Sequence, residues 1–254
     1  KTRAMIVVHF AGLPCDMNKI SEFCKRKNIK IIEDSAETLG AKINGKYTGS
    51  FGIGCFSFFP TKNITTTEGG MLTTENEKIY SYVKKLIAHG IDKNIKRKFW
   101  HRVAVLPGHN FRMPNHLAAI GYSQLKRIEK FNRARNKIAN LYNSELSKPF
   151  YKINIPYIPK GFTHSYQMYT ITVDAKIRDN LLYFLKKNNI EASAHFDPPL
   201  HSQKYLKKYY KKKLPVTEKL SKEIITLPIF PDMTKKEVFY VIKTIKKFYK
   251  INNL

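Results

Sequence analysis

In the N-terminal third of the chain, the pattern of hydrophobic and polar positions predicts strands that alternate with helices. Buried strands are indicated by four short apolar runs, at residues 5–10, 29–34, 53–59 and 69–74. Asp16 is placed to cap a first helix, whose apolar face includes Met17 and Ile20. A second helix is predicted over residues 76–90, with Gly90 as its end.

The alternation of strands with helices favours an α/β domain with a largely parallel sheet. Ligands of such sheets bind at the carboxyl ends of the strands. Asp34 ends one apolar run and Lys62 follows another, so we expect both side chains at that edge of the sheet.

The pattern changes in the second half of the chain. Residues 115–146 predict one long helix or a kinked pair of helices, because apolar residues recur on one helical face. A strand over 165–173 and a helix over 178–189 then indicate a smaller α+β domain. We therefore predict a large domain over residues 1–128 and a small C-terminal α+β domain over 129–254.

The charge of the chain is unusual. Its 254 residues include 46 Lys and Arg but 19 Asp and Glu, a formal net charge of +27. Such a charge favours anionic partners, either nucleic acid or phosphorylated small molecules. The basic residues do not surround a recognisable nucleic-acid-binding motif, so we favour lysines spread over solvated faces and expect no specific nucleic-acid partner.

Cysteines and apolar runs bear on metal binding and location. The three cysteines lack CxxC spacing and suggest neither a disulfide framework nor a zinc site, so no metal is expected. No apolar run approaches membrane-spanning length and no signal peptide is visible, so we expect a cytoplasmic protein without a membrane partner. The first residue is Lys1 rather than Met, so we expect that the chain is the C-terminal portion of a longer protein.

The stretch CFSFFPTKNITTTEGG, residues 55–70, places Lys62 just after an apolar, aromatic run that breaks at Pro60. A lysine held against an apolar wall can act as a nucleophile toward an aldehyde. The alternative for Lys62 is an ordinary surface lysine. The alternative for Asp34 is a residue that caps a helix or forms a salt bridge. The combination of Asp34, Ser57 and Lys62 at strand ends favours a functional site.

The stretch from residue 31 to residue 74 resembles the cofactor-binding core of the DegT/DnrJ/EryC1/StrS family of pyridoxal-phosphate-dependent sugar aminotransferases. The similarity continues, in the expected order, in GHNFRMPNHLAAIGYSQLKRI (108–128), SAHFDPPLHSQKY (193–205) and LPIFPDMT (227–234). The resemblance implies the type I fold of PLP-dependent transferases, also called the aspartate aminotransferase fold. That fold has a three-layer α/β/α large domain, here incomplete at the N-terminus, and a smaller α+β C-terminal domain.

The resemblance also implies roles for individual residues. Lys62 matches the lysine that holds the cofactor, pyridoxal 5′-phosphate, and shuttles a proton. Asp34 matches the carboxylate beneath the pyridine nitrogen, and Glu37 matches a position near the 3-hydroxyl. Ser57 matches a hydroxyl that binds the cofactor phosphate. Asn110 matches an asparagine that reaches the phosphate of the neighbouring subunit, which implies a homodimer with shared active sites.

Three further residues are candidates for substrate contact: Arg112, His195 and His201. A structural ion pair is an equal alternative for Arg112, and a packed or hydrogen-bonded histidine is favoured for each histidine taken alone. The family's N-terminal segment carries a turn that grips the phosphate and an aromatic residue that stacks on the ring. This chain has no counterpart of either, so we expect weaker cofactor binding.

The implied function is transfer of an amino group from L-glutamate to a keto-sugar nucleotide in amino-sugar or polysaccharide biosynthesis. The motifs around Glu37 and His195 are most similar to those of perosamine synthases, which favours a 4-keto-6-deoxy hexose as substrate. The main alternative is a truncated, non-catalytic remnant of the family that acts only as a binding or interaction protein. A nucleic-acid-binding protein is a third hypothesis and rests on charge alone.

Overall fold

The computed structural model describes residues 1–96, 98–210 and 212–253, and the chain divides into two compact units. The first unit comprises Lys1–Ile128 with Gly161–Thr163, and the second comprises Glu129–Lys160 with His164–Leu254. None of the helices within these described ranges is both long enough and apolar enough to cross a membrane.

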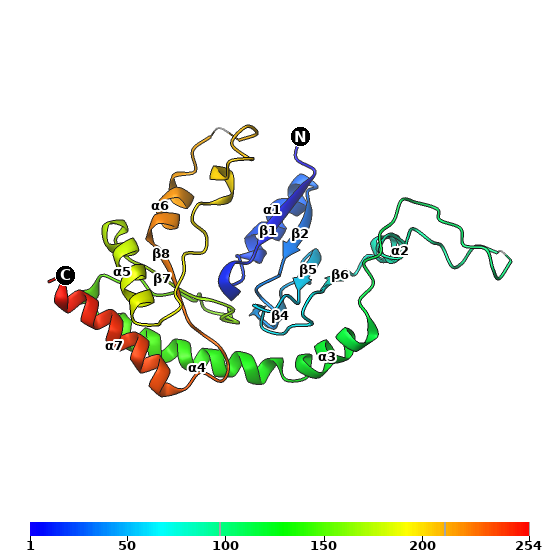
Figure 1. Ribbon diagram of the computed structural model, residues 1–254. Helices are drawn as coiled ribbons and strands as arrows, with labels where there is room; N and C mark the ends of the chain where they lie inside the picture. Colours follow the sequence, from blue (N-terminus) through cyan, green and yellow to red (C-terminus); the bar gives the residue numbers. More distant parts are fainter. Residues whose placement is uncertain (97, 211, 254) are drawn as a thin grey trace. The chain divides into compact units, whose positions relative to one another are not determined.

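A four-stranded sheet organises the first unit (Figure 1). Its strands lie in the order β1 (Ala4–Val8), β2 (Lys30–Asp34), β5 (Ile53–Ser57) and β6 (Gly70–Thr73). The first three run parallel, and β6 pairs antiparallel with β5. All four predicted strands are present, although the first ends at Val8 because Phe10–Gly12 form a short 3-10 helix, η1.

The helix α1 (Met17–Lys27) covers one face of this sheet. Asp16 caps it as predicted, because its side chain accepts a hydrogen bond of 3.3 Å from a backbone amide in the first turn. Met17 packs against Val7 of β1 in a small apolar cluster. Side chains alternate across a strand, and Val8 is 54% exposed, so the opposite face of β1 stays open to solvent.

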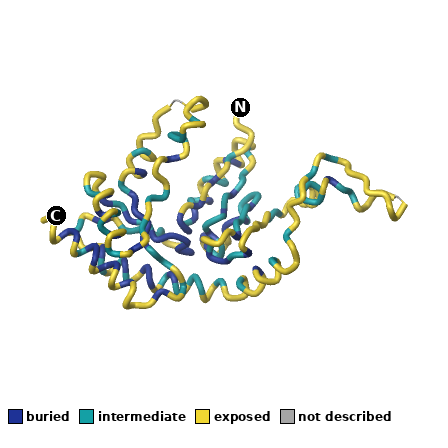
Figure 2. Tube along the Cα trace, in the orientation of Figure 1, coloured by how far each residue is buried: buried dark blue, intermediate teal, exposed yellow. Residues whose placement is uncertain are grey.

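The remaining elements of the first unit are short or exposed. They are a hairpin of β3 (Lys42–Ile43) and β4 (Lys46–Tyr47), α2 (Glu77–Leu86) and α3 (Asn115–Leu125). The predicted second helix therefore ends at Leu86, four residues before Gly90. Most positions of α3 are exposed (Figure 2), and Gly121 is its one buried residue.

The second unit combines helices with a two-stranded antiparallel sheet. Its elements are α4 (Ile128–Leu146), η2 (Pro149–Tyr151), β7 (Tyr169–Thr172), α5 (Ala175–Lys187), η3 (Leu200–Ser202), α6 (Pro215–Glu223), β8 (Ile224–Leu227) and α7 (Lys235–Ile251). The segment 115–146 thus forms two helices, α3 and α4, rather than one. The strand predicted over 165–173 is shorter, because Tyr166 has a φ of 45° that no strand tolerates.

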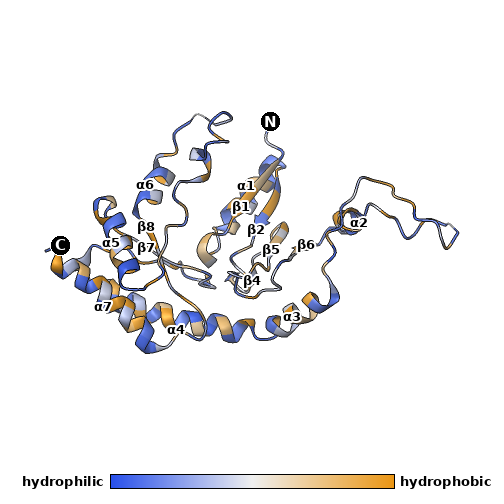
Figure 3. Cartoon of the chain, in the orientation of Figure 1, coloured by the Kyte–Doolittle hydropathy of each residue, from blue (hydrophilic) through white to orange (hydrophobic). Residues whose placement is uncertain are grey.

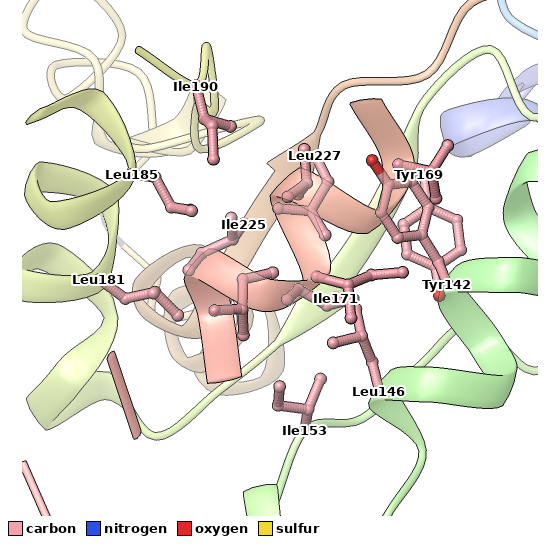
Figure 4. Packing of buried hydrophobic residues seen from close by; sticks show 14 of the residues in the cluster. Tyr142, Leu146, Ile153, Tyr169, Ile171, Leu181, Leu185, Ile190, Ile225 and Leu227 are labelled. Carbon is pink, nitrogen blue, oxygen red and sulfur yellow. The ribbon is translucent and has the colours of Figure 1, made fainter. Parts of the chain in front are cut away.

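A large hydrophobic core holds the second unit together (Figure 4). It takes side chains from α4, α5 and α7 and from both strands of the β7–β8 sheet. The rings of Tyr142 and Tyr169 lie 4.7 Å apart, and their hydroxyls donate hydrogen bonds to Pro228 O and Asn143 Oδ1. Along α7 hydrophobic and hydrophilic positions recur with the helical period (Figure 3), so one face joins the core while most of the lysines remain exposed.

Candidate active site

Two polar side chains end neighbouring parallel strands of the first unit. Asp34 is the last residue of β2 and pairs in register with Cys55, and Ser57 is the last residue of β5. Asp34 Oδ1 accepts a hydrogen bond of 3.1 Å from the Ala36 amide. Both side chains therefore lie at the carboxyl edge of the sheet, where α/β proteins bind their ligands.

Lys62 lies in the turn that leaves this edge. Its backbone amide donates to Phe59 O at 2.9 Å, and the buried side chains of Phe58 and Ile64 anchor the turn on either side. The Lys62 amino nitrogen lies 3.4 Å from Glu37 Oε1. The exposed fractions of these two side chains are 17% and 13%, so the lysine faces a carboxylate in a largely shielded position.

The carboxylate of Glu37 is held from its other side by the main chain. Its Oε2 accepts a hydrogen bond of 2.7 Å from the Ala11 backbone amide. Ala11 belongs to η1 and has a φ of 59°, in the left-handed region. A charge-assisted hydrogen bond of this length restricts the rotamer of Glu37 and thereby directs its second oxygen toward Lys62.

Asn110 and Arg112 contact each other in the first unit. Arg112 Nε donates to Asn110 Oδ1 at 3.2 Å, and one terminal nitrogen of Arg112 lies 3.3 Å from His89 Nε2. The side chains involved are exposed. The contacts that the structure shows for Arg112 are thus with an amide and an imidazole, rather than the ion pair that was one alternative.

His195 and His201 belong to the second unit and are hydrogen-bonded there. His195 Nδ1 lies 2.9 Å from Thr226 Oγ1, and His201 Nε2 lies 3.2 Å from Glu218 Oε1. These contacts agree with the hydrogen-bonded alternative for each histidine. A substrate role for either of them stays a prediction.

Sequence reasoning missed the buried pair of Glu33 and His9. Glu33 Oε1 accepts hydrogen bonds from the amides of Phe51 at 2.7 Å and Gly52 at 2.9 Å. Its Oε2 accepts from the Gly49 amide at 2.8 Å and from His9 Nε2 at 3.1 Å. A signal was available, because a carboxylate inside the apolar run 29–34 has to find buried donors.

These donors decide the charge of Glu33. Burial alone raises the pKa of a carboxyl group, but the hydrogen bonds from His9 and from the three backbone amides outweigh it. The pKa of Glu33 therefore lies below its usual value, and the residue is ionised near neutral pH. An anion thus sits next to Asp34, under the edge of the sheet that carries the candidate site.

On this fold, a lysine amine beside a sheet edge is typical of PLP-dependent transferases when that edge carries a carboxylate and a hydroxyl. The chain belongs to the DegT/DnrJ/EryC1/StrS aminotransferase family, because the family model matches residues 1–246. Aminotransferases of this family depend on pyridoxal 5′-phosphate. The family and the cofactor predicted from the sequence are thereby confirmed.

Two curated relatives match almost the whole chain. GDP-perosamine synthase of Escherichia coli O157:H7 is 37% identical over 255 residues, which cover 98% of this chain and 66% of the relative. An uncharacterized protein of Methanocaldococcus jannaschii is 36% identical over 265 residues, which cover 99% of this chain and 68% of the relative. The chain thus spans about two thirds of the length of the curated relatives it matches.

A solved structure confirms the predicted fold class. The aminotransferase TlmJ from Streptoalloteichus hindustanus superimposes with a TM-score of 0.93 at 27% sequence identity. The match covers 100% of this chain and 67% of that structure. The mixed sheet and the helices described above are therefore those of the aspartate aminotransferase fold.

Proposed function

We propose that this chain carries the active site of a PLP-dependent aminotransferase that moves an amino group from L-glutamate to a keto-sugar nucleotide. The observation that supports it best is the shielded amine of Lys62, held 3.4 Å from Glu37 beside the strand ends of Asp34 and Ser57. The family to which the chain belongs indicates the class of reaction, amino-group transfer.

The side chains at the candidate site carry the kinds of functional group that bind pyridoxal 5′-phosphate. An amine can bind the aldehyde, a carboxylate can pair with the ring nitrogen, and a hydroxyl can bind the phosphate. Lys62, Asp34 and Ser57 supply these groups, and Glu37 would lie near the ring hydroxyl. When bound, the cofactor supplies a carbonyl that accepts an amino group and a ring that spreads negative charge.

Each residue then has a defined task. Lys62 would hold the cofactor and carry a proton on Nζ to and from the reacting carbon. Asp34 would supply a carboxylate to the ring nitrogen, which favours the protonated form of that nitrogen. Asn110 would bind the phosphate of a second subunit, so the proposal includes a homodimer with shared sites, and Arg112, His195 and His201 are proposed to approach the sugar nucleotide.

The substrate is proposed from the relatives. GDP-perosamine synthase is 37% identical, which favours a 4-keto-6-deoxy hexose linked to a nucleoside diphosphate. The net charge of +27 suits a substrate that carries a diphosphate. Glutamate as donor, a role in polysaccharide biosynthesis and a cytoplasmic location complete the proposal.

The absorption spectrum with added pyridoxal phosphate tests the proposal. We expect a visible band that bleaches when L-glutamate is added and that is missing in Lys62→Ala. Lys187→Ala, which removes an exposed lysine of α5, is the matched control and should keep the band. A chain without a band, or with the same band in Lys62→Ala, would contradict the proposal and favour a non-catalytic binding protein.

A further inference from the structure

His9 is fully buried after the end of β1, and its hydrogen bonds select one tautomer. The Cys15 backbone amide donates to His9 Nδ1 at 3.1 Å, so this nitrogen is an acceptor. The ring proton therefore lies on Nε2 and is donated to Glu33 Oε2 at 3.1 Å. A neutral imidazole and an ionised carboxylate thus form one directed contact in the interior.

This contact joins three segments of the chain. Glu33 accepts hydrogen bonds from backbone amides of the turn at residues 49–52, and His9 Nδ1 accepts one from the Cys15 amide. The backbone amide of His9 also donates to Asp34 O at 3.1 Å, which extends the ladder between β1 and β2. The turn from His9 to Cys15 is therefore fastened at both of its ends.

Ala11 lies in the middle of that turn. Its φ of 59° and ψ of 1° are unfavourable for a residue with a Cβ atom, so the surrounding contacts have to impose them. In this conformation the Ala11 amide points at Glu37 Oε2, 2.7 Å away. The other oxygen of Glu37 then meets the Lys62 amine at 3.4 Å.

We propose that His9 and Glu33 are positioning residues for Lys62. They hold the turn in which the Ala11 amide fixes Glu37, and Glu37 in turn fixes the Lys62 amine at the edge of the sheet. The inference rests on the proposed function, because it takes Lys62 as the residue that binds the cofactor. The simpler account is that the pair stabilises the interior and has no effect on Lys62.

Four variants separate these two accounts. Glu33→Gln removes the charge, and His9→Leu removes both ring contacts with a side chain of similar volume. His9→Gln keeps an N–H group near the place of Nε2 and tests rescue by a conservative change. Cys24→Ala trims a buried side chain of α1, so it serves as the control for a loss of stability alone.

The first readout is the distribution of label after treatment with pyridoxal phosphate and borohydride. Peptide mass spectrometry gives the ratio of label on Lys62 to label on the exposed Lys187. We expect this ratio to fall on the order of tenfold in Glu33→Gln and His9→Leu, because displacement of a reacting group by about 1 Å has effects of this size or larger. His9→Gln should lose less, and Cys24→Ala should match the wild type.

The second readout needs no cofactor. Reductive methylation of the free chain, well below its melting temperature, reports the accessibility of Lys62 relative to Lys187. We expect the ratio to rise in Glu33→Gln, because the amine is no longer held on Glu37, and to rise less in His9→Gln, which keeps an N–H group toward Glu33. Glu33→Gln decides the question if His9→Leu does not fold.

The outcomes separate this inference from the proposed function. A wild-type chain whose label is not concentrated on Lys62 would overturn the proposed function and this inference with it. A wild-type chain that is labelled at Lys62, with both ratios unchanged in Glu33→Gln, would overturn the inference alone. A fall in melting temperature without a change in either ratio would do the same.

Discussion

The amine of Lys62 and the carboxylate of Glu37 lie 3.4 Å apart with most of both side chains shielded from solvent. A shielded ammonium group is costly unless an anion faces it. Glu37 meets this need and is itself restrained by the Ala11 amide. The lysine that follows an apolar strand is therefore held in place by a carboxylate rather than by apolar contacts alone.

We expect Glu37→Leu to lower the free energy of unfolding by about 2 kcal/mol, because the Lys62 amine and the Ala11 amide both lose their acceptor. Glu37→Gln keeps one acceptor oxygen and should cost less than about 1 kcal/mol. Urea denaturation followed by circular dichroism measures both values. The exposed pair of Glu129 and Arg133 is the control, and Glu129→Gln should change stability by less than about 0.5 kcal/mol. Equal effects of Glu129→Gln and Glu37→Leu would contradict the role given to Glu37.

The strand ends that carry Asp34 and Ser57 could be predicted, because apolar runs and the break at Pro60 mark them locally. The direction of β6 could not, since its residues fit a parallel or an antiparallel neighbour equally well. The hairpin of β3 and β4 also escaped prediction, because strands of two residues have no measurable alternation.

The contacts around Lys62 were harder to foresee than its position. Glu37 precedes it by 25 residues, and His9 precedes Glu33 by 24 residues, so no local spacing reports either pair. The left-handed conformation of Ala11 is equally hidden, because alanine gives no signal for a positive φ. The chemistry of the site was thus visible in the residue types, whereas its scaffold depends on long-range contacts.

His164 should make the second unit sensitive to acid. Burial lowers the pKa of His164 to about 3, and its Nδ1 accepts a hydrogen bond of 2.9 Å from the Tyr166 amide. An exposed histidine has a pKa of about 6.5, so between these values the unfolded chain binds a proton that the folded chain does not. Stability should therefore fall with pH below about 6.5, and by about 2 kcal/mol between pH 7 and pH 5.

The matched variant for this prediction is His164→Asn. Its side-chain oxygen can still accept from the Tyr166 amide but takes up no proton in this range. Chemical denaturation at a series of pH values gives the comparison. We expect the wild type to lose about 2 kcal/mol more than the variant between pH 7 and pH 5. Parallel curves for the two chains would show that His164 is not the group responsible.

We expect Gly90 to be essential for the folded conformation of the segment that precedes Asn110. Its φ is 70°, and a Cβ atom at this position would lie 1.8 Å from Leu106 O, a backbone atom that cannot move aside alone. Gly90→Ala should therefore break the pairing of residues 90–91 with residues 104–106, and trypsin should cleave at the already exposed Lys93 and Arg102 much faster. Gly45→Ala is the control, because its φ is 84° but no atom lies within 4 Å of the added Cβ. It should cost only the backbone strain, about 1–2 kcal/mol, without faster cleavage near Gly90.

The proposed exchange of Asn110 between subunits can be tested by mixing inactive chains. Lys62→Ala and Asn110→Ala should each fail to give a cofactor band that bleaches with glutamate. In a mixed dimer one of the two sites contains an intact Lys62 from one chain and an intact Asn110 from the other. Random reassociation should therefore restore about a quarter of the wild-type sites.

The control for this mixing experiment is the pair Lys62→Ala and Asp34→Ala. Both residues belong to the same sheet edge of one chain, so neither site of a mixed dimer would be complete, and we expect no recovery. Recovery in the first mixture alone would establish that Asn110 acts on the neighbouring subunit. No recovery in either mixture would mean that Asn110 serves its own chain, where Arg112 already donates to it at 3.2 Å.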